Sequence, residues 1–286
     1  MNKDIFDIND NEIRVIGSTK HEPERPNPKH RRWLWVILAI LLMVALYFFW
    51  AVNRRAYSPV VYYSEEPIAD SSQIVSYPVQ ADTKAYTIVS HDSINDIALR
   101  IYTPVGGHVE LLTGQLPDND NSIILATQAA DYRADNGNIS GAFVYKGELL
   151  SRGYPKYGFC AIIGDTLTMG MSKETILFER AVEQEGYFFR QFSLVHDGKF
   201  GEKVPKGKAI RRALCYYKES ITIIETVDYE SLHDFSQALI DMGVQESIAL
   251  VGSIELPLYV DEEGNRITNE IEHQEEAQET YIVWRK

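Results

Sequence analysis

Cysteine is scarce in this 286-residue chain, which contains only Cys160 and Cys215. Two cysteines can form at most one disulfide, so the chain is not a small scaffold held together by many cross-links. The two could pair with each other. Cysteine is more often a small buried side chain, however, and we expect both to lie in the core.

Positive charge is also in short supply. The chain has 28 Lys and Arg against 41 Asp and Glu, a formal net charge of −13. Non-specific binding to nucleic acid requires a cationic surface that neutralises phosphates. We therefore expect no nucleic-acid partner.

The common catalytic signatures are absent as well. There is no G-x-S-x-G turn, no H-E-x-x-H pair, no phosphate-binding P-loop and no C-x-x-C pair. The seven histidines are scattered, and no two of them lie at the spacing typical of metal ligands. The sequence thus predicts no metal site and no cofactor, and it gives no histidine a role.

A long apolar run is the clearest feature that is present. Residues 33–52 read WLWVILAILLMVALYFFWAV and contain no charged side chain. Twenty helical residues span about 30 Å, the thickness of the hydrocarbon layer of a membrane. A cleaved signal peptide is the alternative, but the run is too long and no A-x-A cleavage site follows it. We expect a single transmembrane helix.

Basic residues flank this helix unequally, which predicts its orientation. Residues 17–32 carry five of them, whereas the stretch just after the helix carries only Arg54 and Arg55. Cytoplasmic flanks are usually the more basic ones. We therefore expect a membrane protein of the cell envelope, with its N-terminus in the cytoplasm and its C-terminal domain outside it.

Composition divides the chain into four segments. Residues 1–32 are polar and proline-containing, which predicts a disordered cytoplasmic tail, and the helix at 33–52 follows. Residues 53–85 have few periodic apolar positions and predict a stalk or linker. Residues 86–286 predict one folded domain.

Short β-prone runs separated by turn residues dominate this domain. Strands are expected at 86–89, 96–102, 108–112, 122–127, 141–145, 158–163, 192–196, 213–217, 220–226, 247–251 and 281–284. Helices are expected at 173–185 and 229–242; Ser231 would cap the second helix and Gly243 would end it. Strands outnumber helices, so we predict an α+β domain of mixed β-sheets with a few helices.

An acidic segment, residues 261–279, precedes the last expected strand. It contains few apolar residues and predicts a solvated loop. A metal-binding loop is the alternative, but the spacing of Asp, Asn and Gly that a calcium loop requires is missing.

Three stretches carry residues suited to binding or catalysis. The first, residues 126–137, ends a strand and contains Gln128, Asp131, Arg133 and Asp135. Such a loop could bind a polar ligand such as a sugar, although a turn that uses its side chains to bond its own backbone is the simpler interpretation.

The second stretch, residues 199–212, reverses the sign of the chain's charge. It holds six basic residues, among them Arg211 and Arg212, against the single acid Glu202. Arginine and lysine suit a phosphate group. A sheet edge protected by lysines is an equally good interpretation.

The third stretch, residues 248–255, is an apolar strand that ends at Gly252 and Ser253 and is followed by Glu255. Strand ends frequently carry functional groups.

In this order, the three stretches resemble motifs of the phosphodiester glycosidase family, over roughly residue 96 to the C-terminus. The matching segments are Ala126–Ala130, Gly141–Glu148, Gln191–Gly198, Arg211–Cys215, Tyr229–Met242 and Ala249–Ser253. The resemblance implies the family's fold and a site for a sugar joined to a phosphate. It implies ligand-binding roles for Gln128, Asp131, Gln191, Arg211, Arg212 and Ser253.

The chain departs from the family pattern at polar positions. Gln128 replaces the usual asparagine, no Gly-Pro follows Gln191, and Val251 stands where the family has an aspartate. Glycosyl transfer normally uses carboxyl groups, and valine offers none. If the chain is catalytic, the candidate carboxylates are Asp131, Asp135 and Glu255.

Three functions follow from this comparison. The first is a relative with weakened or no activity that binds a glycan or glycosyl phosphate. The second is an active hydrolase of sugar–phosphate diesters with a relocated carboxylate, and the third is a structural or partner-binding envelope protein. We expect the first.

Overall fold

A computed structural model describes residues 28–56, 74–76, 84–117, 119–133, 137–268 and 279–286 of this chain. The chain divides into two units, residues 1–58 and residues 59–286. The tail expected at 1–32 therefore lies largely outside the described residues.

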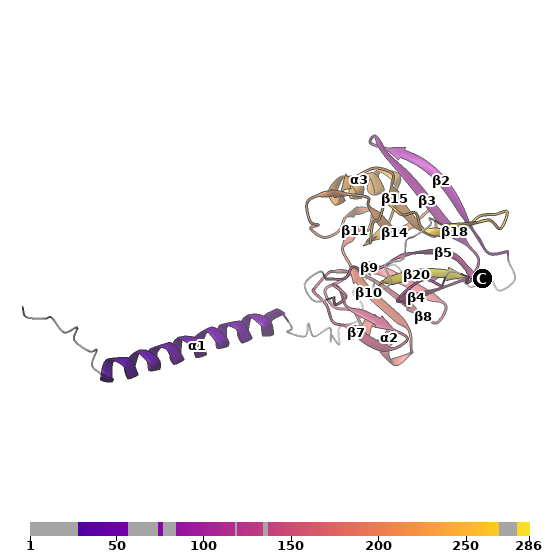
Figure 1. Cartoon of the computed structure of the whole chain (residues 1–286). Helices are drawn as coiled ribbons and strands as arrows, with labels where there is room; N and C mark the ends of the chain where they lie inside the picture. Colours follow the sequence, from indigo (N-terminus) through magenta and orange to yellow (C-terminus); the bar gives the residue numbers. More distant parts are fainter. Residues whose placement is uncertain (1–27, 57–73, 77–83, 118, 134–136, 269–278) are drawn as a thin grey trace, which may run out of the picture. The chain divides into compact units, whose positions relative to one another are not determined.

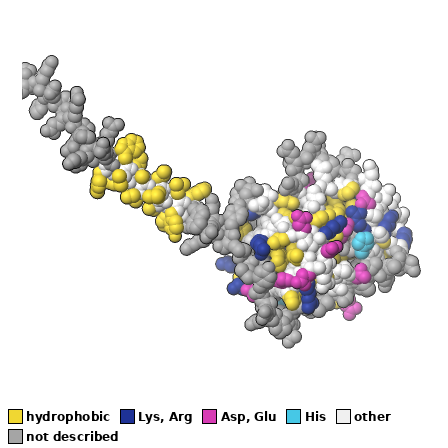
Figure 2. Space-filling view, turned by 90° about the horizontal axis from the view of Figure 1, so that it is seen from below, with side chains coloured by type: hydrophobic (Ala, Val, Ile, Leu, Met, Phe, Trp, Pro, Cys, Tyr) yellow, Lys and Arg dark blue, Asp and Glu magenta, His cyan; other side chains and the backbone are white. Residues whose placement is uncertain are grey.

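The first unit contains α1 (Pro28–Ala56), an unbroken helix of 29 residues. Its described apolar side chains are largely exposed, for example Leu41 at 60% and Leu42 at 63%, and Figure 2 shows them along the helix. Within the described part of the chain, no helix meets the combined length and hydropathy expected of a membrane-crossing segment.

The second unit is built mainly from three antiparallel sheets. The six-stranded sheet has the order β1 (Ile74–Ser76), β9 (Thr166–Met171), β8 (Gly158–Ile163), β10 (Tyr187–Gln191), β6 (Phe143–Tyr145) and β7 (Glu148–Ser151). The seven-stranded sheet has the order β12 (Lys199–Phe200), β11 (Ser193–His196), β17 (Glu246–Leu250), β14 (Arg212–Tyr217), β15 (Ser220–Thr226), β3 (Ile97–Val105) and β2 (Tyr86–Ile94).

The five-stranded sheet has the order β19 (Arg266–Ile267), β18 (Leu258–Val260), β5 (Ile123–Gln128), β20 (Thr280–Arg285) and β4 (His108–Thr113). A short pair joins β13 (Lys208–Ala209) to β16 (Glu230–Ser231). Figure 1 shows the last strand, β20, between β4 and β5, where it completes the five-stranded sheet.

One hydrophobic core is shared by the three sheets. It contains Phe143 and Cys160 from the six-stranded sheet, Leu214 from the seven-stranded sheet, and Ile282 and Trp284 from the five-stranded sheet, all completely buried. Side chains alternate between the two faces of a strand. The residues next to these in sequence therefore point into separate clusters on the outer faces of the sheets.

Helices cover two of those outer faces. On the seven-stranded sheet, α3 (Leu232–Met242) buries Phe235 and Leu239 against Ala213 and Cys215. On the six-stranded sheet, α2 (Leu177–Glu183) packs against Phe159 and Phe188. Figure 1 shows α3 beside β11, β14 and β15, and α2 near β7 and β8.

The two largest sheets are joined where β10 passes into β11. Gln191 ends β10 in one sheet and Ser193 begins β11 in the other, so the chain changes sheets at Phe192. A Cβ atom added to Gly158 would lie 2.5 Å from the Gln191 carbonyl oxygen and 2.6 Å from the Ser193 nitrogen. Only glycine permits so close a backbone approach at this crossing.

The sheet-dominated α+β class is confirmed. Every strand pairing among the described residues is antiparallel, whereas mixed sheets were expected. Two-residue turns join β2 to β3, β8 to β9 and β14 to β15, and such short turns can connect only antiparallel neighbours. The Ser231 cap is confirmed, because its Oγ accepts a hydrogen bond from the Asp234 nitrogen at 3.0 Å, and Gly243 ends α3 with φ of 90°.

Other boundaries differ from expectation. β1 lies inside the segment 53–85 that was expected to be a stalk, where it pairs with β9. Arg266 and Ile267 form β19, so the expectation of a solvated loop is wrong there; the rest of that segment from 269 to 278 lies outside the described residues. Both cysteines are free and buried, as expected.

Candidate functional site

Arg212 lies at the centre of a buried network and uses all five of its N–H groups within the protein. Nε and Nη2 donate to Glu225 Oε2 at 2.9 and 2.6 Å. Nη1 donates to Thr127 Oγ1 at 2.8 Å and to the Val251 carbonyl at 3.4 Å, and Nη2 also donates to the Glu255 carbonyl at 2.8 Å. A guanidinium has five donors, so none remains for a ligand in this arrangement.

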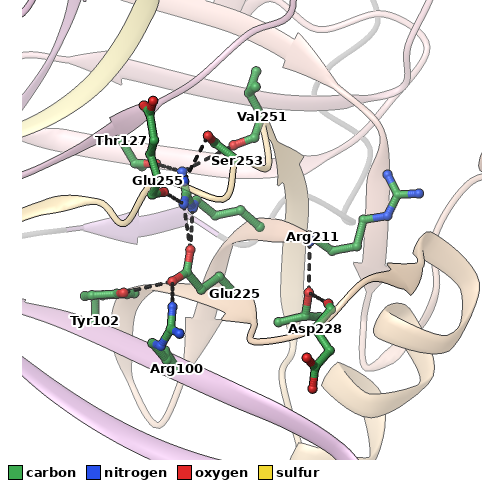
Figure 3. Close-up of polar contacts among 11 residues, drawn as sticks. Arg100, Tyr102, Thr127, Arg211, Glu225, Asp228, Val251, Ser253 and Glu255 are labelled. Carbon is green, nitrogen blue, oxygen red and sulfur yellow. Dashed lines mark hydrogen bonds and ion pairs between the residues drawn. The ribbon is translucent and has the colours of Figure 1, made fainter. Parts of the chain in front are cut away.

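Glu225 is the shared acceptor of this network. Its Oε1 accepts from Arg100 Nη1 at 2.9 Å and from the Tyr102 hydroxyl at 2.8 Å, while Oε2 faces Arg212. Burial, reinforced by the Glu225 charge, raises the pKa of Tyr102, so its hydroxyl keeps its proton. Figure 3 shows Arg100 and Tyr102 pointing toward Glu225. Two arginines and a tyrosine thus compensate one buried carboxylate.

The network fixes the third candidate stretch through its main chain. Arg212 holds the carbonyls of Val251 and Glu255, and Ser253 Oγ accepts from the Glu255 nitrogen at 3.1 Å. Val251, Ser253 and Glu255 are all half-buried. The structure therefore assigns Arg212 to holding this turn in place, and any role of Ser253 or Glu255 toward a ligand stays a prediction.

Arg211 points away from that network, as Figure 3 shows. Its Nε donates to the Glu230 carbonyl at 2.7 Å and its Nη2 to the Gly207 carbonyl at 2.5 Å. Burial lowers the pKa of Arg211, and the negative charge of Asp131 opposes that shift. Although they are adjacent in sequence, Arg211 and Arg212 thus have different surroundings.

Lys156 is the centre of a second polar group, which we call the Lys156 cluster: Lys156, Gln191, Ser140 and Asp131. Lys156 is only 7% exposed. Its Nζ donates to Gln191 Oε1 at 2.6 Å and to Ser140 Oγ at 2.9 Å, and lies 3.8 Å from Asp131 Oδ2. Three segments distant in sequence therefore meet at one ammonium group.

The charge of Lys156 is poorly solvated. Burial lowers its pKa from the ordinary 10.5, and the charges of Asp131 and Glu202 partly reverse that shift. The Phe192 ring adds a further contact, with its centroid 5.0 Å from Nζ. A buried lysine with perturbed ionisation beside an exposed carboxylate is a common feature of functional sites.

Local structure explains how these groups come together. The Ser140 nitrogen donates to the Asp131 carbonyl at 2.7 Å and Tyr132 bridges Ile139, so the loop folds back and places Asp131 near Ser140. Gln191 is 1% exposed, and its Nε2 lies 3.5 Å from the Ala129 carbonyl. Asp131 keeps 52% of its side chain exposed, which leaves the cluster open to solvent at that point.

The loop that carries Lys156 is held from behind by Arg190, which is completely buried. Nη1 of Arg190 donates to the carbonyls of Lys156 at 2.9 Å, Tyr157 at 3.2 Å and Ser172 at 2.6 Å. The aromatic rings of Phe159 and Phe188 lie within 6.0 Å of its guanidinium carbon. The main chain at Lys156 and Tyr157 is therefore fixed by a charged group that never reaches solvent.

Of the residues predicted for ligand binding, the structure gathers Asp131 and Gln191 around Lys156. Arg211 is related to this group through the charge of Asp131, which opposes the lowering of the Arg211 pKa. Gln128 is half-buried at the end of β5, directly before Ala129. Arg212, Ser253 and Glu255 belong to the Glu225 network, and Asp135 lies outside the described residues. Sequence reasoning missed Lys156; its only signal was a lysine between Tyr154-Pro155 and Tyr157-Gly158, a turn flanked by aromatic residues.

Comparison with known proteins gives a distant likeness in fold. No protein-family model and no curated protein sequence matches the chain. Among solved structures, it is similar to the catalytic domain of zebrafish N-acetylglucosamine-1-phosphodiester alpha-N-acetylglucosaminidase, auto-inhibited by its pro-peptide. That match has a TM-score of 0.52 and 16% identity, and it covers 76% of this chain and 88% of the other.

A second solved structure, a hypothetical protein from Synechocystis, matches with a TM-score of 0.40 and 10% identity over 72% of this chain and 64% of the other. Its similarity is too low to support an argument. The zebrafish match shows that the domain has a fold distantly like that of a phosphodiester glycosidase. Activity must be argued from the site itself.

Replacing Glu225 with alanine should lower the free energy of unfolding by about 3–5 kcal/mol, because Arg212 would become an uncompensated buried charge. Chemical denaturation followed by tryptophan fluorescence, to which Trp284 contributes from the core, measures this. Glu148→Ala, at an exposed position, should change stability by less than about 0.5 kcal/mol. A Glu225→Ala protein as stable as the Glu148→Ala protein would contradict the assigned role of the network.

Lys156 should lose its proton below the ordinary lysine pKa of 10.5, because burial disfavours its charged form. Asp131→Asn should lower the pKa of Lys156 further, since that substitution removes a charge that favours protonation. NMR of lysine labelled at Cε, titrated through the alkaline range, reports this side chain. A Lys156 signal that titrates at or above the ordinary value of 10.5 would show that the ammonium is solvated.

The lowered pKa of Lys156 also predicts whether its contribution to stability rises or falls with pH. Between the lowered pKa of folded Lys156 and the ordinary value of 10.5, the unfolded chain binds more protons than the folded one. The contribution of Lys156 to the free energy of unfolding should therefore rise with pH across that interval.

Proposed function

We propose that this chain is an extracytoplasmic binding protein for a glycan or glycosyl phosphate, anchored by its N-terminal helix and catalytically weak or inactive. The observation that carries the proposal is the Lys156 cluster. It brings one cation, one carboxylate and a buried amide into one partly exposed group, within a fold distantly like that of a phosphodiester glycosidase catalytic domain.

The charges of the cluster suit an anionic ligand. Lys156 presents an ammonium that burial has partly stripped of water, and such a group interacts with an anion more strongly than a solvated one does. Among the residues that the structure describes, the two main-chain bonds above leave further guanidinium donors on Arg211. The negative charge of Asp131 favours the protonated forms of both Lys156 and Arg211. A phosphate would compete with this half-exposed carboxylate for the two cations.

The surroundings also suit a sugar. Tyr154 and Tyr157 are each 42% exposed and lie on either side of Lys156 in sequence. Tyrosine combines an apolar ring with a polar hydroxyl, as a sugar combines C–H faces with hydroxyl groups. The Ser140 hydroxyl and the Asp131 carboxylate supply hydrogen-bonding groups of both kinds near the same ammonium.

The carboxyl groups argue for weak or absent catalysis. Glycosidases generally use a pair of them on either side of the bond that breaks. Val251 has a hydrocarbon side chain at the position where the resembling family has an aspartate, and the Arg212 network fixes its main chain. Asp131, exposed and beside Lys156, is the best-placed carboxylate for a relocated role, so an active hydrolase would depend on it.

Calorimetry on the full chain in detergent should detect binding of N-acetylglucosamine 1-phosphate but little of the methyl glycoside, which lacks the phosphate. Lys156→Met should weaken that binding about 10- to 100-fold, because it removes a charged hydrogen-bond donor. Lys199→Met, in the basic segment and at an exposed position, is the matched control and should leave affinity unchanged.

Absence of heat at millimolar ligand, or equal losses in the two lysine variants, would reject the binding site. The same preparations should be incubated with an aryl-phosphoryl sugar. Release of the sugar at enzymatic rates, abolished by Asp131→Asn, would replace the proposed binder with an active hydrolase.

Membrane anchoring is the second part of the proposal, and its support is the uncharged run at 33–52 with its unequal basic flanks. The exposed apolar surface of α1 is consistent with a helix that is covered by lipid.

The full chain should resist extraction from membranes by alkaline carbonate and be released only by detergent. A double substitution, Leu41→Arg with Leu42→Arg, should increase the carbonate-soluble fraction, because each arginine costs roughly 2.5–3.5 kcal/mol at the centre of a spanning helix. The matched control, Leu41→Ala with Leu42→Ala, should stay in the pellet. Extraction of the unaltered chain by carbonate would disprove the anchor.

A further inference from the structure

Three backbone N–H groups converge on one oxygen beside Lys156. The nitrogens of Tyr157, Gly158 and Ser193 donate to Glu202 Oε1 at 2.9, 3.1 and 2.9 Å. We call this group the amide nest. Two of its donors follow Lys156 directly, and the third begins β11 at the crossing between the two largest sheets.

We infer that the amide nest is a subsite for a phosphoryl group, and that Glu202 occupies it in the absence of ligand. Clustered backbone N–H groups form anion-binding concavities in proteins. An anionic oxygen already sits in this one, and Glu202 attracts the Lys156 ammonium electrostatically. The inference deepens the proposed function, on which it rests, by specifying where the phosphate of a glycosyl phosphate would bind.

The number of N–H donors in the amide nest favours an anionic ligand. A single carboxylate oxygen accepts all three bonds, and charge-assisted bonds of this kind are roughly twice as strong as neutral ones. A phosphoryl group could distribute the same donors over several oxygens. The nest also has a further donor close by, because the Ser193 hydroxyl is buried and has no hydrogen-bond partner among the described residues.

The close packing of the crossing keeps the nest in shape. Gly158 admits no Cβ there, and a Cβ on Gly201 would lie 2.4 Å from both the carbonyl oxygen and the hydroxyl of Ser193. Arg190 holds the carbonyls of Lys156 and Tyr157 on the opposite side of those peptide groups. The N–H groups are therefore positioned by the fold and do not depend on Glu202 to point the same way.

Glu202 can leave the nest without movement of the main chain. Its backbone is tied to β11 by its own nitrogen, which donates to the Ser193 carbonyl, and by the Gly201 nitrogen, which donates to the Leu194 carbonyl, both at 3.0 Å. Its side chain is only half-buried, and Tyr157 beside it is exposed. A change of side-chain rotamer would expose the three donors to a ligand arriving from solvent.

A purely structural carboxylate makes a different prediction. If Glu202 only ties the crossing together, removing its charge weakens the fold and creates no affinity for anions. If Glu202 competes with a ligand, removing its charge strengthens anion binding. Glu202→Gln separates the two, because the amide keeps an oxygen for the three N–H groups while losing the negative charge.

The experiment titrates inorganic phosphate, and separately glucose 1-phosphate, into the full chain in detergent. Amide chemical shifts of Tyr157, Gly158 and Ser193 report occupancy of the nest. Glu202→Gln and Glu202→Ala should each bind phosphate at least about tenfold more tightly than the unaltered chain, with saturating shifts of all three amides. Glu148→Gln changes the net charge equally at an exposed site and should leave phosphate binding unchanged.

Folded Glu202→Gln protein that binds phosphate no more tightly than the unaltered chain would overturn the inference, as would equal gains in Glu148→Gln. If Glu202→Ala fails to fold, Glu202→Gln alone decides. Tight binding of the glycosyl phosphate by the unaltered chain with no gain in the Glu202 variants would reject the nest but leave the proposed function standing. If the Glu202 variants bind inorganic phosphate more tightly but no form of the chain binds the glycosyl phosphate, the nest would stand and the proposed function would be rejected.

Discussion

The structure depends on a buried carboxylate and the three groups that surround it. Glu225 is 1% exposed and accepts hydrogen bonds from Arg100, Tyr102 and Arg212. An isolated charge at this depth would be very unfavourable, so the four side chains stabilise the fold only together. Arg212 also donates hydrogen bonds to Thr127 of the five-stranded sheet and to the turn after β17. These bonds hold the two sheets and the turn in a fixed arrangement.

Much of the fold could be predicted from the sequence, and the reasons for the failures are physical. Strands with turn residues at both ends, such as Gly158–Ile163 and Ser220–Thr226, were placed within the observed bounds. β10 was missed because its run of Phe188, Phe189, Arg190 and Gln191 is buried on both faces and shows no alternation. No local pattern shows that such an arginine will be covered by rings and carbonyls from other segments.

The site was predictable only in part, for the same reason. Asp131 was recognised in a polar loop after a strand, Arg211 in a basic segment and Gln191 through the family resemblance. Asp131 and Gln191 do lie near one ammonium group. Arg212 was expected to behave like its neighbour, but the alternation of β14 turns it into the interior. Lys156 became visible only in three dimensions, because burial and its partners come from segments that are distant in sequence.

The proposed function separates binding from chemistry. The proposed ligand would bind at Lys156 and the amide nest, while Val251 stands after β17, where the family that the sequence resembles has an aspartate. Under this proposal, a fold distantly like that of a phosphodiester glycosidase would bind its ligand without a carboxylate at that position. Function on a shared fold follows the site.

Arg190 has one further consequence. Because its guanidinium bonds the carbonyls of Lys156, Tyr157 and Ser172 from the interior, the loop beside the Lys156 cluster is already ordered before any ligand arrives. Association of the proposed ligand would then cost little conformational entropy in this loop. The proposed binding would therefore not require this loop to close around the ligand.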